Sequence, residues 1–284
     1  MTKPGARLGE NSYGKSRVRL SRITRLGDKH LFNEWTVSVL LEGDFETSFT
    51  EADNSKILPT DTMKNTVYSI ARDSKATTLE EFAIDLGDYL LTNNPQVSGV
   101  LVEVEEKAWE RLTTESGQEP TTFKLGGPEL QTVRAVRDHG REWSIRSGVD
   151  GLVILKTTKS EFTGYIKDRL TTLKPSADRI FATRATVAWD YAVEAPAFAE
   201  ARGRIMAALL KVFAGHHSMS VQHTIFDMGK AALEAAPEIS RIKLTMPNLH
   251  HLLADLSPFG QDNPNHIFVA TDEPHGYIEA TIER

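Results

Sequence analysis

The sequence predicts an α+β fold in which antiparallel sheets carry paired helices on one face, with this arrangement occurring twice along the chain. Apolar and polar residues alternate with a period of two in several segments, which is typical of half-buried strands. The helical segments come in pairs between groups of strands, whereas a parallel sheet requires helices and strands to alternate. The order strand–strand–helix–helix–strand–strand appears in both halves. We therefore expect two modules, residues 1–140 and 141–284, that share architecture without obvious residue identity.

Four strands are predicted in the first half. Alternating residues begin around Val18 and run again from Trp35 to Leu41, with a turn near Gly27 between them. After the helical region, alternation returns from Val100 to Val104 and from Leu130 to Val136. Because such strands have one apolar face, we expect helices to cover that face.

Two helices are predicted between these strand pairs. Apolar residues recur on one helical face from Met63 to Ala71. A second helix starts after Thr78, where Glu81 three residues later completes a capping box, and it ends at Asn93-Asn94-Pro95. The apolar stripe of the second helix consists of Phe82, Leu86, Tyr89 and Leu90.

The second half repeats this order. Strands are predicted from Leu152 to Leu155 and from Ile180 to Trp189, followed by a long helix from Phe198 to Val212. A shorter helix follows Ser220, which is a favourable N-cap residue. The two closing strands are predicted at Ile242–Met246 and, as the last strand, at Ile267–Ala270.

Composition excludes several classes of protein. The chain has 284 residues, 40% of them hydrophobic, a formal net charge of -6 and no cysteine. We therefore expect no nucleic-acid binding, no disulfide and no thiolate chemistry. No apolar run is long enough for a membrane helix, the stretch Met1–Tyr13 lacks the apolar core of a signal peptide, and the C-terminal residues are not of the peroxisomal Ser-Lys-Leu type. These features predict a cytoplasmic protein without membrane association.

Common cofactor and catalytic motifs are absent: Gly-x-Gly-x-x-Gly, the Walker loop, His-Glu-x-x-His and Gly-x-Ser-x-Gly. Two histidine doublets, His216-His217 and His250-His251, are the main hint of a metal. Adjacent strand residues point to opposite faces, so one doublet offers a strand-based site at most one ligand. Surface or structural histidines are the favoured interpretation, and no metal is predicted.

The segment from Leu155 to Trp189 closely resembles the signature of the urate oxidase family. Other segments match that family in the same order, so the resemblance extends from about Ser12 to Ile282. These segments are Tyr13-Gly14-Lys15, Thr60-Asp61 with Lys64-Asn65-Thr66, Ser220-Val221-Gln222, and Pro247-Asn248 with His250.

The resemblance implies a tunnelling fold, with two modules per chain and four chains that build a β-barrel tunnel. It also implies oxidation of urate by O₂ and water to 5-hydroxyisourate and hydrogen peroxide, with no cofactor and no metal. The partners implied are urate, O₂ and three further copies of the chain, with active sites shared between subunits.

The resemblance assigns substrate binding to four residues of the second half. Phe162 would stack on the flat purine and Arg179 would bind a carbonyl and a ring nitrogen, which suits a permanently charged fork of donors. Gln222 would pair with the other edge through its carboxamide, and Val221 would offer its backbone N–H. Without the family pattern, these residues would be read as a core aromatic, a surface arginine and a helix start.

The remaining assignments concern protons and oxygen. In similar enzymes Thr60 and Asp61 reach the substrate from a neighbouring subunit, although both residue types are also ordinary helix caps. Lys15, Thr60 and His250 resemble the proton-relay set, and Thr60 with Asn248 would hold oxygen or water above the ring. Lys15 can act as a base only when it is neutral part of the time.

Two alternative functions remain open from the sequence. One is a zinc-dependent enzyme of the same fold that acts on pterin-type substrates, although several such enzymes need a cysteine that this chain lacks. The other is a non-catalytic purine-binding protein. Metal analysis tests the first alternative and a turnover assay tests the second.

Overall fold

The computed structural model describes residues 6–284, so the first five residues of the polar N-terminal stretch lie outside it. The chain divides into two compact units, Met1–Ser147 and Gly148–Arg284. The boundary predicted at Gly140 falls in the turn that precedes the fifth strand, whereas the units divide after Ser147, within that strand.

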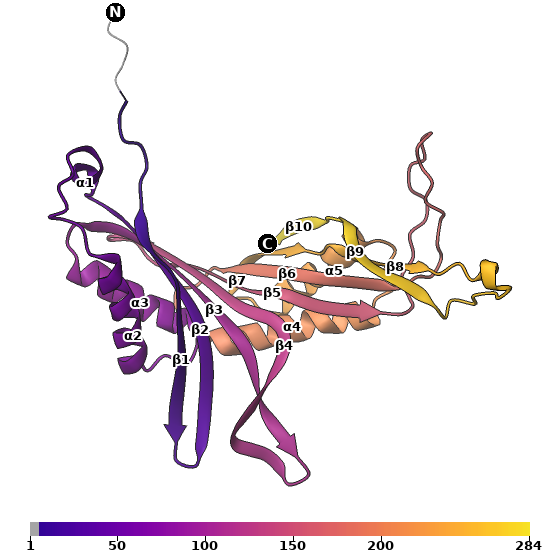
Figure 1. Ribbon diagram of the computed structural model, residues 1–284, viewed down its shortest axis with the longest axis horizontal. Helices are drawn as coiled ribbons and strands as arrows, with labels where there is room; N and C mark the ends of the chain where they lie inside the picture. Colours follow the sequence, from indigo (N-terminus) through magenta and orange to yellow (C-terminus); the bar gives the residue numbers. More distant parts are fainter. Residues whose placement is uncertain (1–5) are drawn as a thin grey trace, which may run out of the picture. The chain divides into compact units, whose positions relative to one another are not determined.

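Four long antiparallel strands form the sheet of the first unit in the order of the chain (Figure 1). The predicted turn is confirmed, because Gly27 adopts a φ of 62° between the first two strands. The third and fourth strands extend well past their predicted apolar cores, since their distal hairpin is mostly exposed and polar and so carries no alternation signal. The strands are β1 (Tyr13–Leu26), β2 (Lys29–Gly43), β3 (Val97–Thr114) and β4 (Gly117–Asp138).

Both helices predicted for this unit are present, as α2 (Thr60–Asp73) and α3 (Leu79–Asn93). A five-residue helix, α1 (Glu46–Thr50), was not predicted, and none of its residues is buried. The stripe of α3 is confirmed at Phe82, Leu86 and Leu90, but Tyr89 is 44% exposed and does not belong to it.

The core of the first unit lies between these helices and one face of the sheet. Helix α2 contacts β1, and α3 contacts β3 and β4. Trp35 on β2 stacks on Phe82 of α3 with ring centroids 4.6 Å apart, and both rings are buried. Burial of such large rings stabilises the packing of helix on sheet.

The second unit has the predicted helix pair and more strands than predicted. The expectation that Ile267–Ala270 forms the last strand is wrong, because β10 follows it, and β8 was also not predicted. Strand β8 lacks apolar alternation and β10 buries only Ile282, so neither gives a clear period-two signal. The elements are β5 (Ser144–Lys156), β6 (Phe181–Tyr191), α4 (Phe198–Gly215), α5 (Val221–Ala235), β7 (Ile239–Thr245), β8 (Asn248–Leu253), a 3-10 turn (Ser257–Phe259), β9 (Phe268–Gly276) and β10 (Glu279–Glu283).

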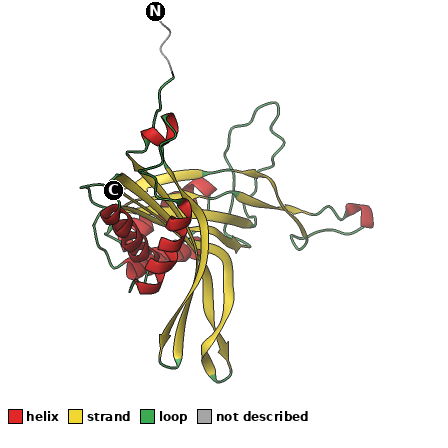
Figure 2. Ribbon diagram, turned by 60° about the vertical axis from the view of Figure 1, so that its left-hand side comes forward, coloured by secondary structure: helices red, strands yellow, loops and turns green. Residues whose placement is uncertain are grey.

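The sheet of the second unit runs β5-β6-β7-β10, with α4 and α5 packed on one another and α5 packed on β7 and β10 (Figure 2). Strand β6 pairs with β7 from Thr186 onward and with β8 at Thr183, which lies opposite Asn248. The chain therefore passes along one edge of β6 through the Met246-Pro247 corner, and this placement sets where Asn248 and His250 lie.

The predicted α+β class, with antiparallel strands and paired helices, is confirmed. Within residues 6–284, no helix combines the length and apolar character that crossing a membrane requires.

The capping box of α3 gives a direct stability test. The N–H of Glu81 donates to the hydroxyl of Thr78 at 3.3 Å, and the N–H of Thr78 donates to the carboxylate of Glu81 at 3.2 Å. Replacing Thr78 by Ala leaves a helix N–H without its acceptor and should lower the free energy of unfolding by about 1 kcal/mol. Urea titration of Thr78→Ala checks this, with Thr62→Ala, an exposed position inside α2, as the matched control. Equal stability of the two variants would contradict the expectation.

Candidate active site

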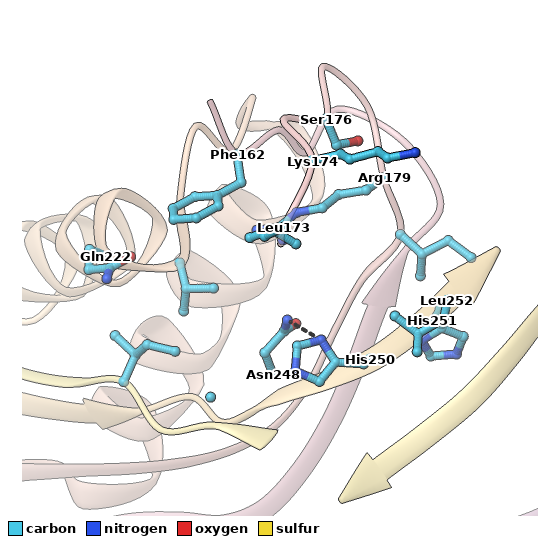
Figure 3. A pocket seen from close by; sticks show the side chains of 14 residues that line it. Phe162, Leu173, Lys174, Ser176, Arg179, Gln222, Asn248, His250, His251 and Leu252 are labelled. Atoms are coloured by element: carbon cyan, nitrogen blue, oxygen red, sulfur yellow. Dashed lines mark hydrogen bonds between the residues drawn. The ribbon is translucent and has the colours of Figure 1, made fainter. Parts of the chain in front are cut away.

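A cavity of about 300 Å³ in the second unit collects most of the residues that the sequence singled out (Figure 3). Its walls come from the loop between β5 and β6, the first turn of α5, and strand β8 with the β9–β10 connection. The predicted site residues on these walls are Phe162, Arg179, Val221, Gln222, Asn248 and His250.

Backbone pairing fixes the loop that carries Phe162 and Arg179. Phe162 and Ser176 exchange two hydrogen bonds, at 2.9 and 3.2 Å, and the N–H of Arg179 donates to Ser160 at 2.8 Å. Ser160 in turn forms a parallel bridge with Ser218, which belongs to the linker between α4 and α5. The loop, which has no regular secondary structure, is therefore held to the scaffold at its base.

The aromatic ring and the guanidinium lie close together. The guanidinium carbon of Arg179 is 5.3 Å from the ring centroid of Phe162, which is within cation–π range. Burial lowers the pKa of Arg179, but an arginine side chain stays charged at physiological pH. Among the described residues, the Arg179 Nε has no hydrogen-bond partner, so this buried donor is free to bind an acceptor on a ligand.

Tyr165 occupies one face of the Phe162 ring. The two rings stack at 4.9 Å with an interplanar angle of 11°, and the Tyr165 hydroxyl donates to the carbonyl of Leu173 at 2.6 Å. Tyr165 does not line the cavity, so stacking on a planar ligand requires the other face of the Phe162 ring.

The first turn of α5 presents backbone donors to the cavity. The hydroxyl of Ser220 accepts the N–H of His223 at 3.1 Å, which confirms Ser220 as the N-cap. Val221 and Gln222 follow as the first helical residues, and the Gln222 side chain is exposed. N–H groups at a helix start lack intrahelical acceptors and carry partial positive charge, so they favour an anion.

Strand β8 supplies a coupled amide and imidazole. The Nδ2 of Asn248 lies 3.1 Å from the Nδ1 of His250, and both side chains are half-buried. An amide donor here leaves the proton of a neutral imidazole on Nε2, on the opposite side of the ring.

The carboxylate of Asp178 forms hydrogen bonds within the loop rather than with the guanidinium of Arg179. Its carboxylate accepts the hydroxyl of Thr158 at 2.7 Å and the N–H of Ser160 at 3.5 Å. The bond from Thr158 is the main cause that holds the pKa of Asp178 below its usual value. Asp178 therefore stays ionised and ties the two ends of the loop together.

Lys15, Thr60 and Asp61 lie in the first unit and do not line this cavity. Thr60 is the first residue of α2, whose N-cap is Pro59 and makes no side-chain cap bond, so neither Thr60 nor Asp61 is the cap residue. Asp61 pairs with Lys64, which lowers the pKa of the Asp61 carboxyl, and the charge of Lys15 lowers it further. The three residues therefore share one neighbourhood within their own unit.

A β-bulge shapes the backbone next to Lys15. The register of β1 against β2 shifts between Lys15 and Val18, and Arg17 adopts a φ of 58°, a left-handed conformation that is unfavourable for this residue type. Bulges turn side chains out of the regular alternation, and such strain is common at functional positions.

Several cavity residues were not predicted. Lys174 and Ser176 lie inside the segment that carries the family signature, and this position in the sequence could have indicated that they line the cavity. His251 and Leu252 line the wall beyond His250, and no sequence signal indicated them because strand β8 was not predicted. Gly276 ends β9 and Ile278 lies in the β9–β10 connection, which the sequence pattern did not reveal.

The site has the features of a receptor for a small, flat anion. Within the described chain, its lining includes Arg179 and Lys174 but no carboxylate. A stacking ring, a guanidinium fork, a carboxamide and a helix start together match a planar molecule with acceptors along two edges. The fold and the site thus define an α+β protein with a cavity whose lining suits an anionic heterocycle.

Comparison with known proteins gives the family. The family model described as "Uricase" matches residues 11–136 and 145–279. A uricase of Arthrobacter globiformis is 42% identical over 277 residues, covering 98% of this chain and 90% of that protein, and a uricase of Dictyostelium discoideum is 35% identical, covering 98% of each. The chain belongs to the uricase family.

Solved structures agree with this assignment. The crystal structure of the Arthrobacter globiformis uricase superposes with a TM-score of 0.93 at 40% identity and covers 99% of this chain and 96% of that one. A urate oxidase from Bacillus sp. TB-90 superposes with a TM-score of 0.82 at 22% identity, over 96% of this chain and 100% of that one, and shows the shared fold.

The loop tie at Asp178 can be tested by hydrogen exchange. Asp178→Ala removes the acceptor of Thr158 and Ser160, so amides of residues 160–162 and 179 should exchange roughly 10-fold faster, as expected when about 1.4 kcal/mol of local stability is lost. Asp255→Ala is the matched control, since Asp255 accepts the N–H of Ser257 in a different segment. Unchanged exchange at residues 160–162 in Asp178→Ala would rule out this role.

Proposed function

We propose that this protein is a urate oxidase, which converts urate, O₂ and water into 5-hydroxyisourate and hydrogen peroxide. The single observation that carries the proposal is the cavity in which Arg179 lies over Phe162, with Val221 and Gln222 on its walls, in a chain of the uricase family. The names of the relatives support the substrate and the reaction.

Urate suits the chemistry of this cavity. It is a flat anion with carbonyl and N–H groups along its edges. In the proposed complex the purine stacks on Phe162, Arg179 donates two hydrogen bonds to one edge, and the carboxamide of Gln222 pairs with the other edge. The backbone N–H of Val221 and the helix start of α5 add further positive potential for the anion.

The chemical step is proposed to consist of positioning and proton transfer. Urate supplies the electrons that reduce O₂, a hydroperoxide forms at C5 of the purine, and water then replaces peroxide. Asn248 and Thr60 would hold oxygen or water over the ring, while Lys15, Thr60 and His250 would carry protons. The contact between Asn248 and His250 supports this division, because it joins the oxygen site to the relay.

We further propose that the complete site requires a second chain. Thr60 and Asp61 are exposed, and Lys15 is half-buried near Asp61, so a neighbouring subunit can approach all three. In the proposed homotetramer the tandem modules of four chains close a β-barrel tunnel, which would also cover exposed strand edges.

The family match favours urate oxidation over the two alternatives. A zinc-dependent pterin-type enzyme of the same fold would not explain a uricase match over both halves of the chain. Only a turnover measurement distinguishes the proposed enzyme from a non-catalytic purine-binding protein.

The direct test follows urate and oxygen together. Purified, chelator-treated protein is mixed with urate, and ultraviolet absorbance, dissolved oxygen and peroxide are recorded with metal analysis of the same sample. Equal consumption of urate and O₂ with formation of peroxide is the expected result. If the folded protein binds urate without oxygen uptake, the protein is a non-catalytic purine-binding protein. If activity returns only when zinc is added, the zinc-dependent enzyme is favoured.

Substitutions at Arg179 and Lys15 should affect different kinetic constants. Arg179→Ala should raise KM roughly 10- to 100-fold, since hydrogen bonds to charged groups contribute about 1.5–3 kcal/mol. Lys15→Ala should mainly lower kcat, by roughly 100-fold or more, as expected for a lost general base. Steady-state kinetics check both, with exposed Arg169→Ala and Lys29→Ala as controls. Wild-type constants in both site variants would refute the residue assignment.

Mixing two impaired variants, assayed at a urate concentration well below the raised KM, tests the shared site. Thr60→Ala and Arg179→Ala proteins, unfolded and refolded together, should form mixed tetramers in which roughly a quarter of the sites combine an intact Arg179 with an intact Thr60 from the neighbour. Activity should therefore recover above that of either protein alone. If verified mixed tetramers show no recovery, the site lies within one chain.

A further inference from the structure

A second group of chemically active side chains lies in the second unit outside the cavity described above. His216 is the C-cap of α4, and its N–H donates to the carbonyl of Val212 at 2.9 Å. His223 and Asp227 are four residues apart on α5, so both project from one side of the helix. The end of one helix and the start of the next thus bring two imidazoles and one carboxylate together.

The separations among these side chains are those of metal ligands. The Oδ2 of Asp227 lies 3.1 Å from the Nδ1 of His216 and 3.6 Å from the Nε2 of His223, and all three ligand atoms fall within 4.8 Å of one another. Around a tetrahedral zinc ion with bonds of about 2.0–2.2 Å, neighbouring ligand atoms lie about 3.3–3.6 Å apart. The 3.6 Å separation falls within this range and the 3.1 Å separation is slightly shorter, while the His223 side chain is 43% exposed and has room to rotate.

One cation and one carboxylate lie beside His216. The Nζ of Lys156 donates to the backbone carbonyl of His216 at 2.7 Å. The Asp227 carboxylate supplies the negative charge between the two rings.

Solvent reaches this cluster through a hollow that is separate from the cavity of the candidate active site. His216 and Asp227 line a separate hollow of about 670 Å³ between α4 and α5, which shares no lining residue with the candidate active site. Gln222 and His223 are adjacent, but successive helical residues point about 100° apart. One helical turn can therefore place Gln222 at the candidate active site and His223 at the cluster with His216 and Asp227. Water can therefore complete the coordination shell of an ion held here.

We propose that His216, His223 and Asp227 form a binding site for a divalent transition-metal ion of the zinc class. Two imidazoles and one carboxylate are donors that zinc, nickel and copper prefer, whereas magnesium and calcium prefer sites made of oxygen. Histidine and a carboxylate four residues apart on one helix is also a spacing that metal sites use, because it aligns both donors on one face.

Zinc alone is the probe for the test. Full-length, chelator-treated protein is titrated with Zn²⁺ against a chromophoric chelator, and the melting temperature is recorded with and without zinc. The wild-type protein should bind one zinc ion per chain at this site and melt at a higher temperature when zinc is present, since binding to the folded state stabilises it. Excess Mg²⁺ should not displace the zinc.

Three variants locate the ion. His223→Ala and Asp227→Asn should each weaken zinc binding by at least about 10-fold and abolish the rise in melting temperature, because each removes a donor. His217→Ala is the matched control: this neighbouring histidine contacts Glu161 at 3.5 Å instead, and its removal should leave zinc binding unchanged. If Asp227→Asn fails to fold, His223→Ala decides the outcome, since its side chain is largely outside the core.

Absence of stoichiometric zinc binding by the wild-type protein overturns the proposal, as does wild-type affinity in the His223→Ala variant. Loss of binding in the His217→Ala control as well would place the ion elsewhere and would also overturn it. None of these readouts uses urate turnover, so the metal site stands or falls independently of the proposed enzymatic activity.

Discussion

The backbone bridge between Ser160 and Ser218 is the interaction on which the candidate active site depends. The N–H of Glu161 donates to Ser218 at 2.8 Å, and the N–H of Ser218 donates to Lys159 at 2.9 Å. One partner belongs to the loop that carries Phe162 and Arg179, and the other precedes the helix that carries Val221 and Gln222. Both serines are buried, so breaking the bridge would leave polar backbone groups without water, which is costly.

Helix α5 transmits this constraint into the core. The hydroxyl of buried Thr224 donates to the Ser218 hydroxyl at 2.7 Å, while Ile225 and Met228 are completely buried against the sheet. The start of the helix therefore cannot shift without disturbing core packing, which tolerates little rearrangement. A receptor for a rigid, flat substrate needs this fixed spacing between its aromatic ring and its carboxamide, since positioning is the main contribution proposed for catalysis.

The same short stretch of chain serves three purposes because of helical geometry. Ser220 caps the helix, Val221 and Gln222 line the cavity of the candidate active site, and His223 and Asp227 belong to the proposed metal site. Positive potential from the helix start and from Arg179 favours an anion on one side, while the Asp227 carboxylate favours a cation on the other. Two charged ligands of opposite sign can thus bind close together without sharing a side chain.

The sequence by itself determined the α+β class, the helix pairs and the N-caps of α3 and α5, because periodicity, the Thr78–Glu81 box and Ser220 are local signals. Its resemblance to the family named six residues that the structure brings into one cavity, and the same resemblance supplied Lys15, Thr60 and Asp61, which the structure keeps in the other unit. The tertiary structure alone decided the strands β8 and β10, the inclusion of His251 in the cavity wall, and the meeting of His216 with His223 and Asp227. The strands β8 and β10 and the cavity wall arise where segments distant in sequence come together, and such pairing depends on the packing of the whole unit rather than on any local pattern. His216 meets His223 and Asp227 because of how the short linker between α4 and α5 folds.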